Sequence, residues 1–177
     1  MKEIINKRKW FWPWQDQEEE KWLETLSKNG LHLSKPGLYG KYSFEVGQPK
    51  DYVYRLDFHS KIKDTETYIQ LFEDSGWEHL GGTTWQYFRK VSKGNDLTEI
   101  FTDNQSKINK YERILAFYGG FLLIYFTLFI ALIGPRQRIP WLNLALTLTY
   151  VPLLLICSIS VIKISKRIKE LKEGFKD

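Results

Sequence analysis

The sequence predicts an α+β protein: a ferredoxin-like sandwich of the order β-α-β-β-α-β, followed by a transmembrane α-helical hairpin. Two apolar runs, residues 114–133 and 141–162, indicate the hairpin. They contain no charge, and each has about the 20 residues that a helix needs to cross a bilayer. An internal repeat indicates the sandwich, because a shift of 46 residues superposes the helix and glycine positions of two segments.

An aromatic run and a helix begin the predicted soluble domain. Residues 9–12 indicate a first strand, which Pro13 stops. Asp16 is the predicted N-cap of a helix, with Glu19 at the capping-box position and the acids 18–20 as a solvated helix start. The helix has one apolar stripe and ends at a glycine: Trp22, Leu23, Leu26 and Gly30.

Two alternating segments and a second helix follow. Residues 42–46 and 52–58 alternate apolar and polar side chains around a turn, which predicts a hairpin with one apolar and one charged face. Residues 65–75 predict a helix, and 77–80 and 85–91 indicate strands. The repeated helix-glycine-strand unit favours two helices packed on one face of a single sheet.

Charge and hydropathy divide the chain into six parts. Nine Lys and Arg flank the apolar runs on the sides of the two termini, against two in the connecting loop, which predicts that both termini are cytoplasmic. The predicted protein is therefore a multi-pass protein of the cell membrane. Its parts are a cytosolic α+β domain (1–102), a connecting helix (103–113), transmembrane helix 1 (114–133), an external loop (134–140), transmembrane helix 2 (141–162) and a basic cytosolic tail (163–177).

The net charge of +5 does not indicate nucleic-acid binding, because the excess lies in the membrane part. Residues 1–113 hold 18 basic and 18 acidic side chains, and a neutral domain lacks the electrostatic footprint for a phosphate backbone. The bilayer is the predicted partner instead. The single cysteine, Cys157, lies in the second run, which excludes an intramolecular disulfide and a cysteine-based metal site.

The search for chemistry predicts no catalytic site, no metal and no cofactor. The sequence has no nucleophile elbow, no phosphate-binding glycine loop and no pair of histidines at ligand spacing. The interpretation is a protein that is not an enzyme. One alternative is a membrane-associated enzyme that uses carboxylates such as Asp57 or Asp103 near the bilayer, and another is a self-assembling membrane protein.

Three features are candidate functional sites. Phe11 and Phe88 are expected on a sheet face that the helices do not cover, where they could contact a small apolar ligand, a protein partner or a second copy, unless they are core. Asp103 and Asn104 are expected to cap the helix that couples the domain to the membrane. Pro152 is a candidate hinge in the second span.

Several short motifs, taken together, carry a family resemblance. They are Glu19-Glu20-Lys21-Trp22-Leu23 followed by Gly30, Tyr52-Val53-Tyr54-Arg55-Leu56-Asp57-Phe58, Gly76-Trp77-Glu78, Trp85-Gln86-Tyr87-Phe88-Arg89-Lys90 and Ile100-Phe101-Thr102-Asp103-Asn104. As a set they resemble a bacterial two-span membrane family of unknown function that is often encoded beside PadR-type transcriptional regulators. The resemblance implies a membrane-anchored regulatory or sensing module in an envelope or stress response, and it implies no catalytic residues.

Overall fold

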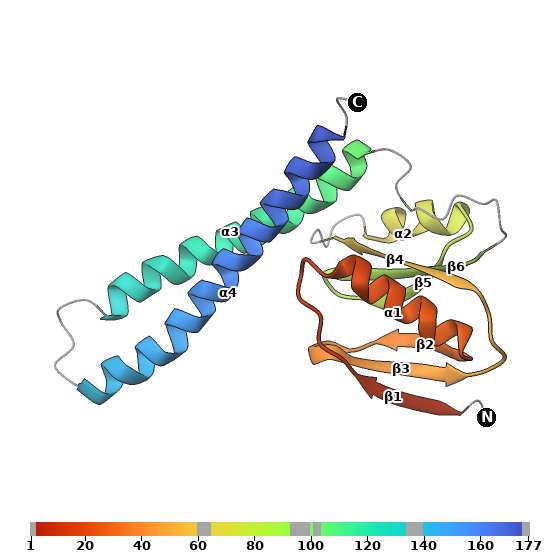
Figure 1. The fold of residues 1–177 in the computed structure, drawn as a ribbon, viewed down its shortest axis with the longest axis horizontal. Coiled ribbons are helices and arrows are strands. Elements are labelled where there is room, and N and C mark those ends of the chain that lie inside the picture. The colour runs from red at the N-terminus through yellow and green to blue at the C-terminus, as the bar shows by residue number, and fades with distance from the viewer. Residues whose placement is uncertain (1–2, 60–64, 93–99, 101–103, 134–139, 175–177) are drawn as a thin grey trace. The chain divides into compact units, whose positions relative to one another are not determined.

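A computed structural model describes the chain apart from residues 1–2, 60–64, 93–99, 101–103, 134–139 and 175–177 (Figure 1). The chain consists of two compact units, residues 1–106 and residues 107–177. The first unit is α+β and the second consists of two long helices, so the predicted fold class is confirmed at this level. Each unit is described below by itself.

The first unit contains two copies of a β-α-β-β arrangement, each with its own three-stranded antiparallel sheet. Both sheets have the same strand order, first, third, second, which agrees with the repeat found in the sequence. The first copy is β1 (Ile4–Arg8), α1 (Asp16–Lys28), β2 (Leu31–Pro36), the short 3-10 helix η1 (Leu38–Gly40) and β3 (Lys41–Val46). The second copy is β4 (Tyr52–Phe58), α2 (Thr65–Asp74), β5 (Glu78–Gly82) and β6 (Trp85–Val91).

This arrangement differs from the single ferredoxin-like sheet expected from the sequence. The predicted hairpin between residues 42–46 and 52–58 is wrong, because β3 pairs with β1 and β2, whereas β4 pairs with β6. Alternation places strands and their faces, but it does not say which strands pair. The first strand also lies earlier in the chain than expected, because Ile4–Arg8, and not residues 9–12, pairs with β3.

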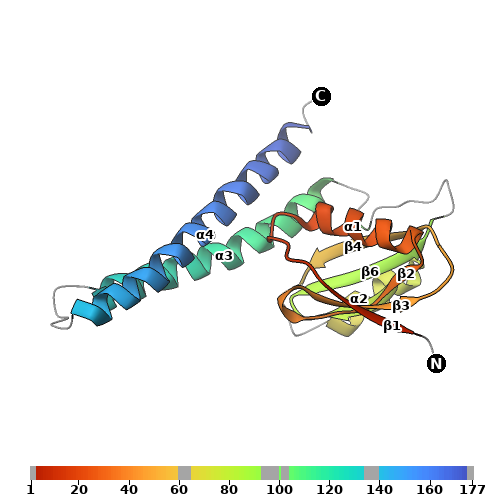
Figure 2. The ribbon, with the colours of Figure 1, turned by 60° about the horizontal axis from the view of Figure 1, so that its bottom comes forward.

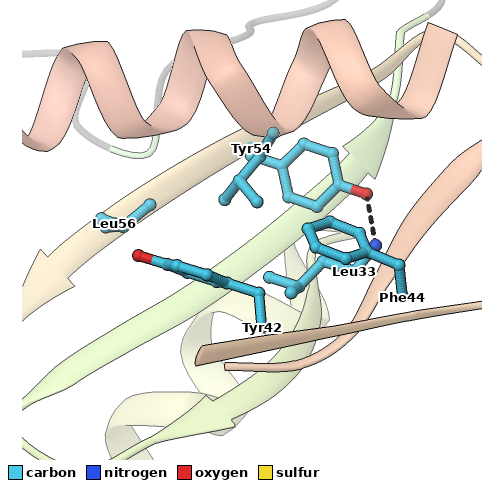
Figure 3. Packing of buried hydrophobic residues seen from close by; sticks show 6 residues of the cluster. Leu33, Tyr42, Phe44, Tyr54 and Leu56 are labelled. Carbon is cyan, nitrogen blue, oxygen red and sulfur yellow. Dashed lines mark hydrogen bonds between the residues drawn. The ribbon is translucent and has the colours of Figure 1, made fainter. Parts of the chain in front are cut away.

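The main core lies between α1 and both sheets (Figure 3). Its fully or nearly fully buried residues come from α1, β2, β3 and β4: Leu23, Leu33, Tyr42, Phe44, Tyr54 and Leu56. The hydroxyl of Tyr54 accepts a hydrogen bond from the backbone N–H of Leu33 at 3.3 Å, so this tyrosine of the second copy is fixed against a strand of the first. The core therefore joins the two copies.

A second core fills the other face of the sheet formed by β4, β5 and β6. Neighbouring residues of one strand go to opposite cores: Tyr54 to the first, and Val53 to the second, where Phe72 of α2 packs on Phe88. Figure 2 shows α1 and α2 on opposite sides of the strands. Both faces of this sheet are covered, and the expectation of two helices on one face is not met.

Gly30 and Gly76 end the two helices at equivalent positions of the repeat. Both have positive φ, 79° and 83°, which L side chains rarely adopt. At Gly30 an added Cβ would also lie 2.5 Å from the backbone oxygen of Gly47. The glycine stops predicted from the sequence are thus required by backbone geometry.

The second unit is an antiparallel pair of helices, α3 (Asn104–Ile133) and α4 (Pro140–Glu173). Both contain stretches long and apolar enough to cross a membrane by length and composition, Gln105–Ala131 and Leu144–Glu173. Only 6% of each apolar window is buried, whereas a core helix of a soluble protein would be mostly buried. Tyr125 contacts Tyr150, and Lys172 pairs with Glu112 at 3.1 Å, which sets the register of the two helices.

Candidate functional site

A buried carboxylate with two tyrosine hydroxyls is the most distinctive polar group of the first unit. Glu19, in the first turn of α1, is only 7% exposed. The hydroxyls of Tyr42 and Tyr87 both donate to its Oε1, at 2.7 and 2.6 Å. We call these three residues the acid–tyrosine cluster.

The cluster connects the two copies of the repeat. Tyr42 is on β3 of the first copy and Tyr87 is on β6 of the second, while Glu19 comes from the helix of the first. Figure 3 shows the ring of Tyr42 beside Leu56 in the main core. A change in the charge or position of this carboxylate would therefore be felt by both sheets.

Burial controls the protonation of the cluster. Loss of solvation raises the pKa of Glu19, an effect that the two hydroxyl donors oppose and the nearby charge of Asp16 reinforces. Burial, followed by the negative charge of Glu19, raises the pKa of both Tyr42 and Tyr87. The phenols thus remain donors at neutral pH, and the carboxyl is the group that can gain or lose a proton.

Two further acids of α1 bind the open edge of β4. Glu20 accepts a hydrogen bond from the backbone N–H of Leu56 at 2.8 Å, and Glu24 accepts one from that of Tyr54 at 3.4 Å. The spacings match, since four residues of helix and two residues of strand each rise by about 6–7 Å. Arg55 lies 2.8 Å from Glu24, which compensates part of the buried negative charge. The interpretation of acids 18–20 as a solvated helix start is wrong for Glu19 and Glu20.

The cap of α1 also differs from the prediction. Gln15 is the N-cap residue and makes no side-chain capping bond, while Asp16 is the first helical residue and is buried. Glu19 faces the two tyrosines instead of completing a capping box. Its buried partners outcompete the local backbone for this carboxylate.

A second polar cluster lies beneath α2. Asp57 of β4 is fully buried and accepts a hydrogen bond from the hydroxyl of Tyr68. Gln86, its partner across the strands, is bonded to His79 at 2.8 Å. The ring of His59 stacks on Tyr68 with centroids 4.2 Å apart. These contacts give Asp57 a structural environment, in which its carboxylate ties α2 to the sheet.

The remaining histidine also has a structural setting. His32 Nε2 donates to the backbone oxygen of Gln48 at 2.8 Å, and Nδ1 lies 3.0 Å from the hydroxyl of Ser27, which in turn is 2.9 Å from the oxygen of Lys50. This set joins the end of α1 to the segment before β4. Among the residues that the structure describes, no group of three or more His, Cys, Asp or Glu is arranged to hold a metal ion.

The structure separates the two phenylalanines that the sequence placed on an open face. Phe88 is 0% exposed and packs with Phe72 beneath α2, so its assignment to an uncovered surface is wrong. Phe11 is half-buried and packs on Trp22 of α1, with ring centroids 5.6 Å apart. The covering helix α2 is the reason, since strand periodicity cannot tell which face a helix covers.

The other candidate residues lie in or next to the second unit. Asp103 is outside the described residues, and Asn104 is the first residue of α3. Pro152 lies inside α4, which runs from Pro140 to Glu173 as one helix. Neither the capping role nor the hinge is tested by these placements.

Sequence reasoning missed the acid–tyrosine cluster because its members are far apart in the chain. Tyr42 and Tyr87 are 23 and 68 residues from Glu19. One local signal was present: Glu19 is three residues before Trp22, on the side of the helix that carries the apolar stripe. A carboxylate in that stripe needs a buried partner.

Comparison with known proteins gives one finding. A family model described as "Protein of unknown function (DUF2812)" matches residues 15–123. This range is more than half of the chain, and it includes all three residues of the acid–tyrosine cluster. Comparisons with curated proteins and with solved structures found no match.

Proposed function

The chain belongs to the DUF2812 family of proteins of unknown function, and we propose that it is a membrane-anchored sensing and regulatory module. In this proposal the hairpin α3–α4 spans the membrane, both termini are cytoplasmic, and residues 1–106 form the sensing domain. We further propose a PadR-type transcriptional regulator as the partner, because the family that the chain resembles is often encoded beside such regulators. The module acts by binding and has no catalytic step.

One observation carries the proposal: α3 continues from a polar start into an apolar span without interruption. The helix begins at Asn104 and ends at Ile133, and the polar residues before Ile114 and the apolar ones after it belong to one element. A continuous helix transmits displacement or rotation along its length, whereas a Gly/Ser linker would uncouple its ends. In this proposal a displacement at the start of α3 is carried along the helix into the bilayer.

The polar ends of the hairpin support the same interpretation. Outside the apolar runs, α4 continues for about three turns past Ile162, and its Lys172 pairs with Glu112 of α3. Ile108 of α3 and Ile164 of α4 are buried in this region, while the side chains of the apolar runs are mostly exposed. The nine basic residues on this side against two in the loop favour the cytoplasm as its location.

The acid–tyrosine cluster is the proposed input. Its carboxyl has a raised pKa and touches both copies of the repeat, so protonation or an approaching cationic group would change the contact between them. A small ligand or a second copy of the chain could impose the same change.

The enzyme alternative has less support. Its candidate acid, Asp57, is fully buried and holds the hydroxyl of Tyr68, which is the environment of a structural carboxylate. In the acid–tyrosine cluster both phenols donate to one oxygen of Glu19, and this satisfies the donors internally.

The test is capture of the full-length chain from native membranes, followed by identification of the regulator that copurifies. Glu19→Gln keeps an acceptor for both tyrosines but removes the charge, so it is expected to alter the amount of bound regulator. Glu18→Gln is the matched control. Because Glu18 is exposed, this variant should capture as much regulator as the native chain. Absence of a PadR-type regulator, or equal capture by both variants, would contradict the proposal.

A further inference from the structure

The N-terminal end of the soluble unit carries a basic and aromatic surface that the sensing role does not use. Residues 7–14, Lys7-Arg8-Lys9-Trp10-Phe11-Trp12-Pro13-Trp14, form what we call the basic–aromatic segment. Its three basic residues are exposed, and the indole of Trp10 is 59% exposed. An indole left largely in water, directly after three exposed cations in the chain, is typical of a contact surface.

The segment has a defined conformation. Trp12 and Trp14 stack with centroids 5.4 Å apart and rings 1° from parallel, and Trp10 contacts the edge of Trp12 at 6.0 Å. The backbone N–H of Lys9 donates to the oxygen of Gly40 at 2.9 Å, and that of Trp12 to the side chain of Gln15 at 3.0 Å. The tryptophans are therefore held in place before any partner binds.

Phe11 is the inward anchor of the segment. It packs on Trp22, and the ammonium of Lys9 lies 4.9 Å from the ring of Phe11 and 5.1 Å from that of Trp22. These cation–π contacts hold Lys9 beside the rings. In the part of the chain that the structure describes, Lys7 and Arg8 make no ion pair with a carboxylate. Their charges are available to an outside anion.

We propose that the basic–aromatic segment docks on the anionic lipid surface of the leaflet from which α3 enters the membrane. An exposed tryptophan that directly follows three exposed cations has the chemistry of the membrane interface, where an indole buries its apolar body and keeps its N–H near polar headgroups. Each basic residue near an anionic leaflet contributes about 1 kcal/mol.

This inference rests on the proposed function, because the hairpin supplies the tether. A domain attached to the bilayer binds it in an effectively intramolecular step, so a weak contact is sufficient. Docking would hold the domain against the leaflet and release it when lipid charge or ionic strength changes. The segment would thus add lipid charge as a second input to the sensing module.

The experiment uses the full chain in proteoliposomes whose lipids are brominated near the headgroup end of the acyl chain. Subtracting the tryptophan fluorescence of the Trp10→Phe variant from that of the native chain gives the contribution of Trp10. We expect this emission to be quenched in phosphatidylglycerol bilayers and to remain unquenched in phosphatidylcholine. Changing Lys7, Arg8 and Lys9 together to Gln should weaken docking by about 100-fold, or about five-fold per residue removed.

A matched control changes three exposed lysines elsewhere in the domain, Lys21, Lys28 and Lys35, to Gln and should leave the quenching intact. Equal quenching of Trp10 in both bilayers, or equal loss in the two triple variants, would overturn the inference. A response of Trp10 to single-stranded DNA without a response to anionic lipid would also overturn it. Flotation with phosphatidylcholine vesicles tests the membrane anchor separately, and regulator capture with Glu19→Gln tests the sensing function without reference to lipid charge.

Discussion

Replacing Glu19 should show how strongly the acid–tyrosine cluster supports the fold. Glu19→Ala removes the acceptor of two hydroxyls, those of Tyr42 and Tyr87, which donate at 2.7 and 2.6 Å. A buried donor left without a partner costs about 1–3 kcal/mol, so the two together cost about 2–6 kcal/mol. Relief from burying a charge offsets part of this, and we expect the free energy of unfolding to fall by about 2–5 kcal/mol.

Glu19→Gln separates the hydrogen bonds from the charge. The amide oxygen of Gln can accept a hydrogen bond from both tyrosines. The free energy of unfolding of this variant should therefore lie within about 1 kcal/mol of that of the native chain at neutral pH. Glu18→Ala, at the neighbouring exposed position, should change stability by less than about 0.5 kcal/mol. The expected order of stability is therefore Glu18→Ala and Glu19→Gln close to native, with Glu19→Ala well below.

The dependence on pH follows from the raised pKa of Glu19. Below the ordinary value of 4.5 the carboxyl is protonated in both the folded and the unfolded chain, and the native chain carries no penalty. Above it the unfolded chain releases the proton first, so the native state binds more protons and stability falls with rising pH until the folded pKa is passed. The stability of the native chain relative to Glu19→Gln should decline across this window and then level off.

Tryptophan emission during heating measures these effects in the full chain, because six of the seven tryptophans lie in residues 1–113. For a domain of about 100 residues, 1 kcal/mol corresponds to about 4–8 °C. Glu19→Ala should thus lower the Tm of the first unit by at least about 8 °C. The assigned role of the cluster is wrong if Glu19→Ala and Glu18→Ala unfold at the same temperature. It is also wrong if the difference in stability between the native chain and Glu19→Gln does not vary with pH.

Three further predictions concern the core, a turn and the topology. Phe88→Ala should lower the free energy of unfolding by about 3–5 kcal/mol in the same assay, since Phe88 is fully buried; a surface role would predict almost no change. Gly30→Ala should cost at least about 1 kcal/mol more than Gly81→Ala, because both have positive φ but only at Gly30 does an added Cβ meet a backbone oxygen, at 2.5 Å; equal melting would refute this. A cysteine replacing Gln137 in a Cys157→Ser background should react with a membrane-impermeant reagent from outside the cell, because the charge bias places this loop externally; labelling only after lysis would refute the orientation.

The sequence alone determined the features that depend on local composition and spacing. The two apolar runs, residues 114–133 and 141–162, lie within α3 and α4, since length and absence of charge need no partner to be recognised. The bounds of the strand 85–91 and the glycines that end both helices were also predicted correctly, because alternation and positive φ are properties of a few adjacent residues. The 46-residue repeat was visible because each of its two units is a local pattern of helix, glycine and strand that recurs in the sequence.

Only the tertiary structure decided which strands pair and which faces are covered. Phe88 alternates correctly along β6, yet whether its face is open depends on where α2 packs, and both faces of that sheet are covered. Glu19 has the local pattern of a solvated helix start, but its hydroxyl partners come from β3 and β6. A buried carboxylate is stabilised by hydrogen-bond donors from distant parts of the chain, and no local spacing in the sequence specifies those contacts.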